Sequence, residues 1–301
     1  MAIYRNINGA RRHQNRCIRN ICPNLLPLPT FMKFWCVTCS LLLLTACSGI
    51  NKVLKSKDPE YKLRMAEQYY AKKKWAYAQQ LYEDVIPFFK GRQEFEDIYY
   101  KYAFTAYNQK DYLNAENLFK TYLEAFPNSS RAAEMDYMRA YTFYKQSPRA
   151  ELDQTATIKA MGMMQTFINT HPGSPRIPEA TAIIDECRKK LEVKDYKAAQ
   201  LYFDMGQYRA AATAFGALTD AYPDSDMGDD YKLMAIRANY KLAELSIEEK
   251  KQERFERVIE ACNEFKDRFP QSELNKEVDQ FITLSQNNLK NTANEPGKKT
   301  T

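Results

Sequence analysis

The sequence predicts an all-α fold built from repeated helix pairs. The chain has 301 residues, of which only 9 are Gly, and its abundance of Ala, Glu, Lys, Gln and Leu favours helix over sheet. From Pro59 to about Asn288 the apolar residues recur with a period of about 3.6, and the alternating β-branched runs typical of strands are missing. In addition, one short motif recurs four times where helices are expected to end.

The first 46 residues are expected to be an export leader that the mature protein lacks. An uncharged apolar run from Phe34 to Leu44 follows a lysine, which is the pattern of a secretory signal peptide and is too short for a permanent membrane span. We expect translation to start at Met32. Residues 1–31, with five Arg and no acidic residue, are then an upstream extension; the alternative is an unusually long n-region of the leader.

The leader ends in Leu44-Thr45-Ala46-Cys47, which resembles the bacterial lipobox. The resemblance implies that the thiol of Cys47 receives a diacylglyceryl group and that cleavage makes Cys47 the N-terminus, where its freed amine is acylated as well. Several acyl chains together give stable membrane anchoring where one does not. The alternative is ordinary cleavage of a leader that happens to contain this Cys.

Removal of the leader changes the composition. Residues 1–46 hold six of the 44 basic residues and none of the 38 acidic ones, so the mature chain has no net charge, which argues against a nucleic-acid partner. Four of the seven Cys also leave, and Cys47 carries lipid. Cys187 and Cys262 remain, at helix-face positions. We expect free buried thiols there, with a single disulfide as the alternative.

The mature chain divides into three parts. Residues 47–57 are short, polar and partly basic, and we expect a lipidated tether there. Residues 58–290 form the repeat domain. Residues 291–301 have almost no apolar side chains, which predicts a disordered tail.

The repeated motif consists of an aromatic residue or His, then Pro, any residue and Ser. Its four occurrences are Phe126-Pro127-Asn128-Ser129, His171-Pro172-Gly173-Ser174, Tyr222-Pro223-Asp224-Ser225 and Phe269-Pro270-Gln271-Ser272. Pro cannot continue the helix before it, and Ser can cap the helix after it. Each motif is therefore expected to separate one helix pair from the next.

Small residues recur at fixed distances along the same segments. Twelve residues before each Pro stand Ala115, Ala160, Ala211 and Val258, and Ala66, Ala103 and Ala140 recur upstream at intervals of 37 residues. Paired helices need small residues where they cross. The pattern resembles the tetratricopeptide repeat, whose superhelix of stacked helix pairs is the fold class we expect. We count five copies, at about 59–91, 94–128, 131–173, 178–224 and 229–271, and a C-terminal capping helix from Glu273 to about Asn288.

The copies are unequal in length. The third and fifth carry about eight extra residues, which we expect between their two helices at Gln146–Asp153 and in the Ile247–Gln252 region. The fourth copy has a long first helix, from Pro178 through Met205. These differences leave the helix-pair pattern intact.

Few residues could carry catalysis. The single His of the mature chain, His171, occupies the aromatic position before a repeat Pro, where helix-end packing explains it. A Ser-His-Asp or Cys-His arrangement would have to use this one His, and a His-based metal site lacks ligands. There is no Gly-rich phosphate loop. We therefore expect no enzyme, and no metal or cofactor beyond the lipid on Cys47; a glycan hydrolase using two carboxylates is the remaining enzyme class.

Aromatic residues give the positive functional signal. In a tetratricopeptide stack the first helix of each copy lines a groove, and residues one turn apart share a face. The candidates for groove residues are Tyr100, Phe104, Tyr107, Tyr137, Tyr141 and Tyr144, with Tyr196 and Phe203 in the fourth copy. Tyr offers apolar area and a hydroxyl for the backbone of a peptide. The alternative is that about half of these rings pack between helices.

The lipobox, the tether, the five copies and the Tyr-Pro-x-Ser type of helix end together resemble the BamD family, the lipoprotein subunits of the outer-membrane β-barrel assembly machinery. The resemblance covers residues 47–290. Met138-Arg139-Ala140 is similar to the Met-Arg-Gly often found in the third copy of that family, with Ala in place of Gly.

This resemblance implies a non-catalytic protein on the periplasmic face of a Gram-negative outer membrane. Its C-terminal copies would bind the POTRA domains of the BamA-type barrel protein, and its N-terminal copies the aromatic-ended targeting segments of unfolded barrel proteins. Other assembly lipoproteins are further partners. Ser48-Gly49-Ile50-Asn51, the residues after Cys47, contain no Asp to signal inner-membrane retention. The alternative is another tetratricopeptide envelope lipoprotein, such as a secretin pilotin or a cell-wall synthesis adaptor.

Overall fold

The structure, a computed structural model, describes residues 48–294 of the chain. Those residues form twelve helices and no strand. The helices are α2 (Ser48–Leu54), α3 (Pro59–Ala71), α4 (Trp75–Phe89), α5 (Phe95–Asn108), α6 (Tyr112–Ala125), α7 (Ala132–Gln146), α8 (Thr155–Thr170), α9 (Ile177–Asp204), α10 (Tyr208–Ala221), α11 (Gly228–Glu244), α12 (Glu248–Arg268) and α13 (Asn275–Asn294). The prediction of an all-α fold is confirmed.

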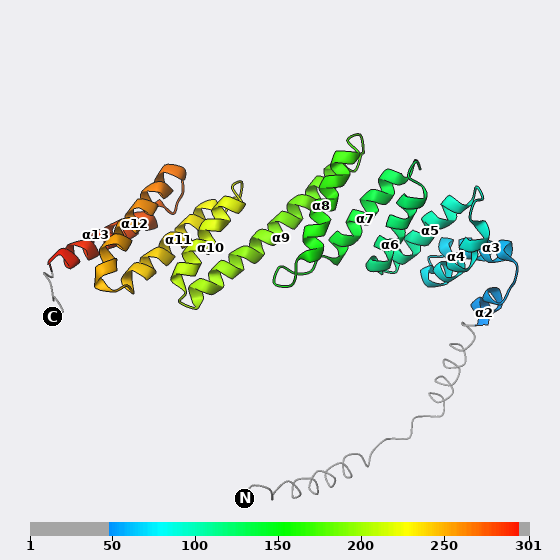
Figure 1. The fold of residues 1–301 in the computed structure, drawn as a ribbon, viewed down its shortest axis with the longest axis horizontal. Coiled ribbons are helices and arrows are strands. Elements are labelled where there is room, and N and C mark those ends of the chain that lie inside the picture. Colours follow the sequence, from blue (N-terminus) through cyan, green and yellow to red (C-terminus); the bar gives the residue numbers. More distant parts are fainter. Residues whose placement is uncertain (1–47, 295–301) are drawn as a thin grey trace, which may run out of the picture.

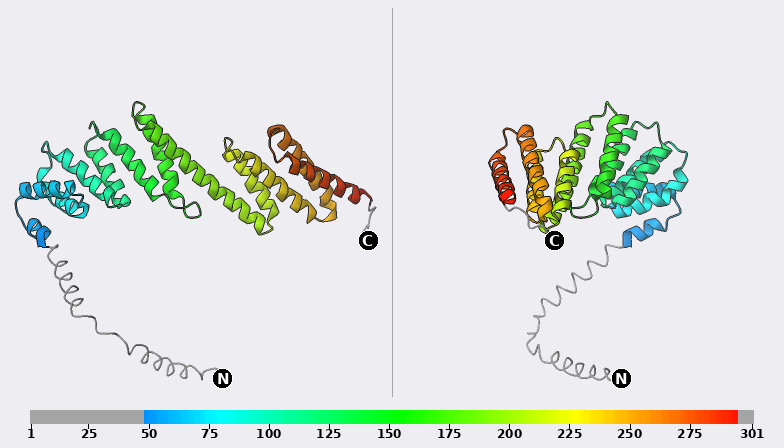
Figure 2. Two further views of the ribbon diagram at one scale, coloured as in Figure 1. Left: turned by 180° about the vertical axis from the view of Figure 1, so that it is seen from behind. Right: turned by 60° about the vertical axis from the view of Figure 1, so that its left-hand side comes forward.

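Helices α3 to α12 form five antiparallel pairs, and α13 packs on the last of them. Each pair contacts the next, so that the chain forms the elongated row of a tetratricopeptide superhelix (Figure 1). The turns within pairs lie along one edge of this row and the turns between pairs along the other, in both the front and the back view (Figure 2). We call them the intrapair edge and the interpair edge.

The four aromatic-or-His-Pro-x-Ser motifs build four interpair turns of the same shape. The residue before Pro ends its helix with an extended φ, between −125° and −131°, as expected for a residue that precedes Pro. The Ser Oγ accepts the amide hydrogen of the residue two positions later, at 3.0 Å for Arg131 and 3.3 Å for Arg176. The same bond recurs at Met227 and Leu274. Ser therefore closes the turn just ahead of the next helix.

The small residues are buried in the cores between the helices, as expected for crossing positions. Ala66, Ala103 and Ala140 in the first helices of three copies are completely buried, as are Ala115, Ala160 and Ala211 in the second helices. A Cβ methyl lets two helix backbones approach closely, which larger side chains prevent. The residues one turn later are completely buried as well: Phe119, Met164, Phe215 and Cys262.

Three expectations about segment boundaries were wrong. The segment expected to be a tether forms α2, because Ile50 and Val53 are buried against the first copy. The charged residues of the Ile247–Gln252 region do not lengthen a loop; they extend α12, which starts at Glu248. Residues 291–294, expected in the tail, belong to α13. Residues 295–301 and the predicted leader and Cys47 lie outside the described residues.

The two remaining Cys are free and buried in different places. Cys187 belongs to the core of copies two to four, and Cys262 to the core beneath α12 and α13. Burial raises the pKa of both thiols. The expectation of free buried thiols, rather than a disulfide, agrees with this arrangement. Between residues 48 and 294, no helix is long and apolar enough to cross a membrane.

Candidate peptide-binding site

The six predicted groove residues come together as one ladder of rings along α5 and α7, which we call the aromatic ladder. Its centroid distances are 4.7 Å for Tyr100–Phe104, 6.3 Å for Phe104–Tyr107, 6.3 Å for Tyr107–Tyr141, 5.7 Å for Tyr137–Tyr141 and 5.5 Å for Tyr141–Tyr144. The Tyr107–Tyr141 contact joins the second copy to the third. Residues one helical turn apart thus share a face, and neighbouring copies continue it.

Tyr137 lies in the core rather than on the surface of the ladder. It is 1% exposed and packs on Phe167 and Tyr141. Burial raises the pKa of its hydroxyl. Tyr137 therefore offers a ligand no surface, and it instead supports the ring of Tyr141 from behind. The other five rings are half-buried.

The hydroxyl groups of the ladder differ in their partners. Tyr100 donates to Glu134 at 3.3 Å, and Tyr144 donates to Glu186. The hydroxyls of Tyr107 and Tyr141 have no hydrogen-bond partner within residues 48–294. Burial raises the pKa of Tyr107, so its hydroxyl stays a neutral donor near pH 7. Tyr107 and Tyr141 are thus the members that can bond to the backbone of a peptide.

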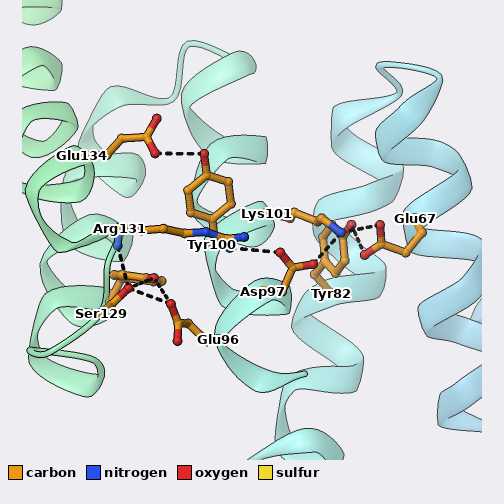
Figure 3. A network of polar contacts seen from close by, with 10 residues as sticks. Glu67, Tyr82, Glu96, Asp97, Tyr100, Lys101, Ser129, Arg131 and Glu134 are labelled. Carbon is orange, nitrogen blue, oxygen red and sulfur yellow. Dashed lines mark hydrogen bonds and ion pairs between the residues drawn. The ribbon is translucent and has the colours of Figure 1, made fainter. Parts of the chain in front are cut away.

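A polar network crosses the first three copies beside the ladder (Figure 3). Glu67 of α3 accepts hydrogen bonds from Tyr82 at 2.9 Å and from Lys101 at 2.7 Å. Lys101 also pairs with Asp97 at 2.6 Å, and Asp97 accepts from Arg131 at 3.0 Å. The chain of contacts links α3, α4 and α5 to the turn before α7, and so holds neighbouring copies in register.

Two carboxylates of this network are stabilised in their ionised form. Burial opposes ionisation of Asp97, but the hydrogen bonds from Lys101 and Arg131 outweigh it and lower the pKa of Asp97. Hydrogen bonds from Ser129 and Tyr122 lower the pKa of Glu96. Ser129 is the Ser of the first repeat motif, so this motif also contacts the first turn of its own copy's first helix.

Two arginines that the sequence analysis missed cover rings of the ladder. The guanidinium of Arg131 lies 4.4 Å from the ring centroid of Tyr100, and that of Arg176 lies 4.6 Å from that of Tyr137. Cations attract the faces of aromatic rings in this geometry. Both arginines stand two residues after the Ser of a repeat motif. A comparison of the four motifs could have found them, because the other two have Met227 and Leu274 at that position.

The remaining candidates lie elsewhere. Tyr196 and Phe203 pack in a separate core with α10 and α11. The ring of His171 packs against that of Phe167 in a tilted arrangement, and its Nε2 lies 3.3 Å from the Oδ2 of Asp136, which is helix-end packing. No group of three or more His, Cys, Asp or Glu that could hold a metal ion is found in the part of the chain that the structure describes. Cys47, the predicted lipidation site, lies outside that part.

Comparison with known proteins places the chain in a family. Residues 56–213, more than half of the chain, match the family described as "YfiO: Outer membrane lipoprotein". The chain belongs to this family. The matched residues span the first three copies and most of the fourth, and they include the whole aromatic ladder.

One curated relative of this YfiO-family chain is the "Putative outer membrane protein assembly factor BamD" of Aquifex aeolicus (strain VF5). The two are 22% identical over 197 residues, which is 65% of this chain and 64% of the relative's length. The match therefore spans somewhat less than two thirds of that relative. Among solved structures, the TPR2AB-domain:pHSP90-complex of yeast Sti1 aligns over 76% of this chain and 98% of its own, with 12% identity and a TM-score of 0.38.

Proposed function

We propose that this protein is a non-catalytic subunit of the outer-membrane β-barrel assembly complex. It is held in the outer membrane of a Gram-negative bacterium by lipid on Cys47 and faces the periplasm. Membership of the YfiO outer-membrane lipoprotein family carries this proposal. The name of the Aquifex aeolicus relative, an outer membrane protein assembly factor, supports it.

In this proposal the two ends of the superhelix have different partners. The C-terminal copies bind the POTRA domains of a BamA-type barrel protein, and other assembly lipoproteins join the complex. The second and third copies, which carry the aromatic ladder, receive the aromatic-ended targeting segments of unfolded barrel proteins. No nucleic acid and no cofactor other than the lipid takes part.

The chemistry of the aromatic ladder supports this use of copies two and three. Half-buried Tyr rings offer rigid apolar contact area at a small cost in side-chain entropy, which is why Tyr is common among residues that dominate binding energy. The free hydroxyls of Tyr107 and Tyr141 can bond to peptide backbone. An extended segment with aromatic side chains fits such a surface.

The ladder is tested with a double variant, Tyr107→Ala with Tyr141→Ala. We expect the affinity for C-terminal peptides of barrel proteins to fall by more than about 1 kcal/mol, or roughly fivefold, because two anchoring rings and two hydroxyls are lost. Fluorescence anisotropy of a labelled peptide measures this. Tyr202→Ala is the control, since Tyr202 is 45% exposed and lies outside the ladder. An unchanged affinity in a folded double variant would mean that these rings pack the fold and do not bind the peptide.

The assembly function is tested by purification of the protein from native membranes in mild detergent. We expect a BamA-type barrel protein in stoichiometric amount. Its absence would count against the proposal, and a secretin or a cell-wall synthase in its place would favour another class of envelope lipoprotein. Glycan cleavage that a single Glu or Asp substitution abolishes would instead indicate a hydrolase.

A further inference from the structure

The intrapair edge exposes large apolar side chains at turn after turn. The side chains of Leu113, Met205, Leu245 and Ile247 are 74%, 62%, 74% and 68% exposed, and Leu152 in the long third turn is 51% exposed. They lie in or directly beside the turns 109–111, 147–154, 205–207 and 245–247. By the same criterion the described interpair turns have two such residues, Met227, which is 41% exposed, and Phe88, which lies just before the turn 90–94 and is 58% exposed.

The fold does not require this pattern. Turns between helices are normally built from polar residues and Gly, because their backbone lies in water. Exposed aliphatic residues that are scattered singly need no explanation, but here at least one lies at each of four successive turns along one edge. The first intrapair turn differs in kind: it consists of Lys72, Lys73 and Lys74, all exposed, directly before Trp75.

A cationic cavity lies beside the last two of these turns. It has a volume of about 610 Å³ and lies between the start of α10, the end of α11 and the start of α12. Arg209, Lys250, Arg254 and Arg257 line it, with Glu253 as the single acidic residue. Ala212 and Leu242 contribute apolar surface. The cavity thus combines an excess of positive charge with a small apolar part of its lining.

The protein neutralises the positive charges of the cavity only in part. Glu253 pairs with Lys250 at 3.3 Å and with Arg257 at 2.6 Å. Arg254 donates to the hydroxyl of Ser246 rather than to a carboxylate. The guanidinium of Arg209 has no ion-pair or hydrogen-bond partner among the residues that the structure describes. One carboxylate faces four cations, so the site suits an anionic group such as a phosphate.

The start of the described chain lies on the same side of the molecule. Helix α2 is at the lower edge of the row, as are the intrapair turns, in the front and the back view (Figures 1 and 2). Ile50 and Val53 fix α2 to the first copy. The chain belongs to a family of outer-membrane lipoproteins. In the proposed anchoring through Cys47, the chain passes from the lipid directly into α2, so the intrapair edge is the edge nearest the anchor.

We propose that the intrapair edge lies on the lipid surface. The exposed aliphatic side chains enter the boundary between headgroups and acyl chains, Lys72–Lys74 face anionic headgroups, and the cationic cavity takes the phosphate of one phospholipid headgroup. The contact orients the superhelix on the membrane. It goes beyond the proposed assembly function and does not depend on which protein the aromatic ladder binds.

The test uses the full-length lipidated protein in vesicles of phosphatidylethanolamine and phosphatidylglycerol with brominated acyl chains, which quench nearby Trp. After Cys47 the chain has one Trp, Trp75, so Trp75→Phe gives a silent background. In this background we introduce single Trp residues by Leu245→Trp and by Met205→Trp, and we expect the brominated lipid to quench most of their fluorescence. The matched control Met227→Trp, on the interpair edge, keeps it. Equal fluorescence at both edges, with native circular dichroism, would overturn the proposal.

The cavity is tested in the Leu245→Trp background by Arg209→Glu with Lys250→Glu. In vesicles that contain phosphatidylglycerol, we expect the lipid to quench the introduced Trp less in this double variant than in Leu245→Trp alone. The control Arg268→Glu should leave the quenching unchanged. Unchanged quenching in the double variant would refute the phosphate site.

Two other results would show that something other than lipid covers the intrapair edge. If Leu245→Trp is unquenched in lipid vesicles but shielded from iodide in native membranes, a protein covers the edge. Shielding in detergent that rises with protein concentration would indicate a second copy; either result overturns the lipid contact.

Discussion

Asp97 shows how single residues tie the copies together. It lies in the first turn of α5, where the helix dipole favours a negative charge. It accepts from Lys101 on its own helix and from Arg131 in the next copy, while Lys101 also contacts Glu67 in the previous copy. Arg131 in turn covers the ring of Tyr100. One carboxylate thus connects three copies to the aromatic ladder.

The lowered pKa of Asp97 predicts how its contribution depends on pH. Because the folded-state pKa lies below the unfolded value, the stabilisation is fully present above the ordinary Asp pKa of about 4 and is lost as the pH falls through the folded-state value. We expect Asp97→Asn to destabilise the protein at pH 7 by up to about 1 kcal/mol, since the side chain is 45% exposed and screened.

Urea denaturation of both proteins between pH 7 and pH 2.5 measures this difference. It should shrink toward zero at the acidic end. The control Asp185→Asn, at an exposed site without a described ion-pair partner, should show no such trend. A difference that stays constant with pH would mean that packing, rather than charge, explains the effect of the substitution.

At the scale of the helices, close approach at the small residues decides the packing. Ala103 of α5 is completely buried in the core of copies two to four. We expect Ala103→Leu to destabilise the fold by about 1–3 kcal/mol, because three additional carbons must fit between packed helices. Thermal unfolding followed by circular dichroism measures it.

Ala198→Leu is the matched control for this substitution. Ala198 lies in the second half of α9 and is exposed, so the same change in size should leave the stability nearly unchanged. If both variants lose equal stability, helix propensity or another general effect would explain the loss. The tight crossing at Ala103 would then have no special role.

At the scale of the whole molecule, α9 joins two separate cores. Its first half contributes Ala180, Ile183 and Cys187 to the core around the aromatic ladder, and its second half contributes Ala199 to the core of α10 and α11. Between them the long third turn docks on α9, where Lys190 bonds to Ser147 at 2.5 Å and Lys194 to the carbonyl of Leu152 at 2.7 Å. The ladder and the cationic cavity therefore belong to different halves of the molecule.

The proposed attachment to the membrane through Cys47 also belongs to the scale of the whole molecule. We expect Cys47→Ala to abolish lipid labelling and to release the protein from the membrane fraction, because no helix within residues 48–294 can span a bilayer. The few side chains of the intrapair edge are too small an apolar area to hold the protein alone. Metabolic labelling with palmitate and membrane fractionation measure both effects. Unchanged fractionation without lipid at Cys47 would contradict the anchor.

The sequence by itself determined the helix pairs, the turns and the crossing residues. Pro after an aromatic residue ends a helix, Ser closes the following turn, and Ala at fixed spacing marks each crossing. These features depend on residues that are close together in the sequence, so they can be predicted from the sequence alone. It also predicted that the rings of α5 and α7 share a surface, since residues one turn apart share a helix face.

Only the tertiary structure decided which of those rings face outward. Tyr137 and Tyr141 are one turn apart in α7, yet Tyr137 is buried because Phe167 and Arg176, tens of residues away, cover it. Distant neighbours decide three other features in the same way. These are the docking of α2, the position of the arginines over the rings and the apolar intrapair edge. Burial is set by the packing of whole helices, and spacing along a single helix cannot show what the next helix covers.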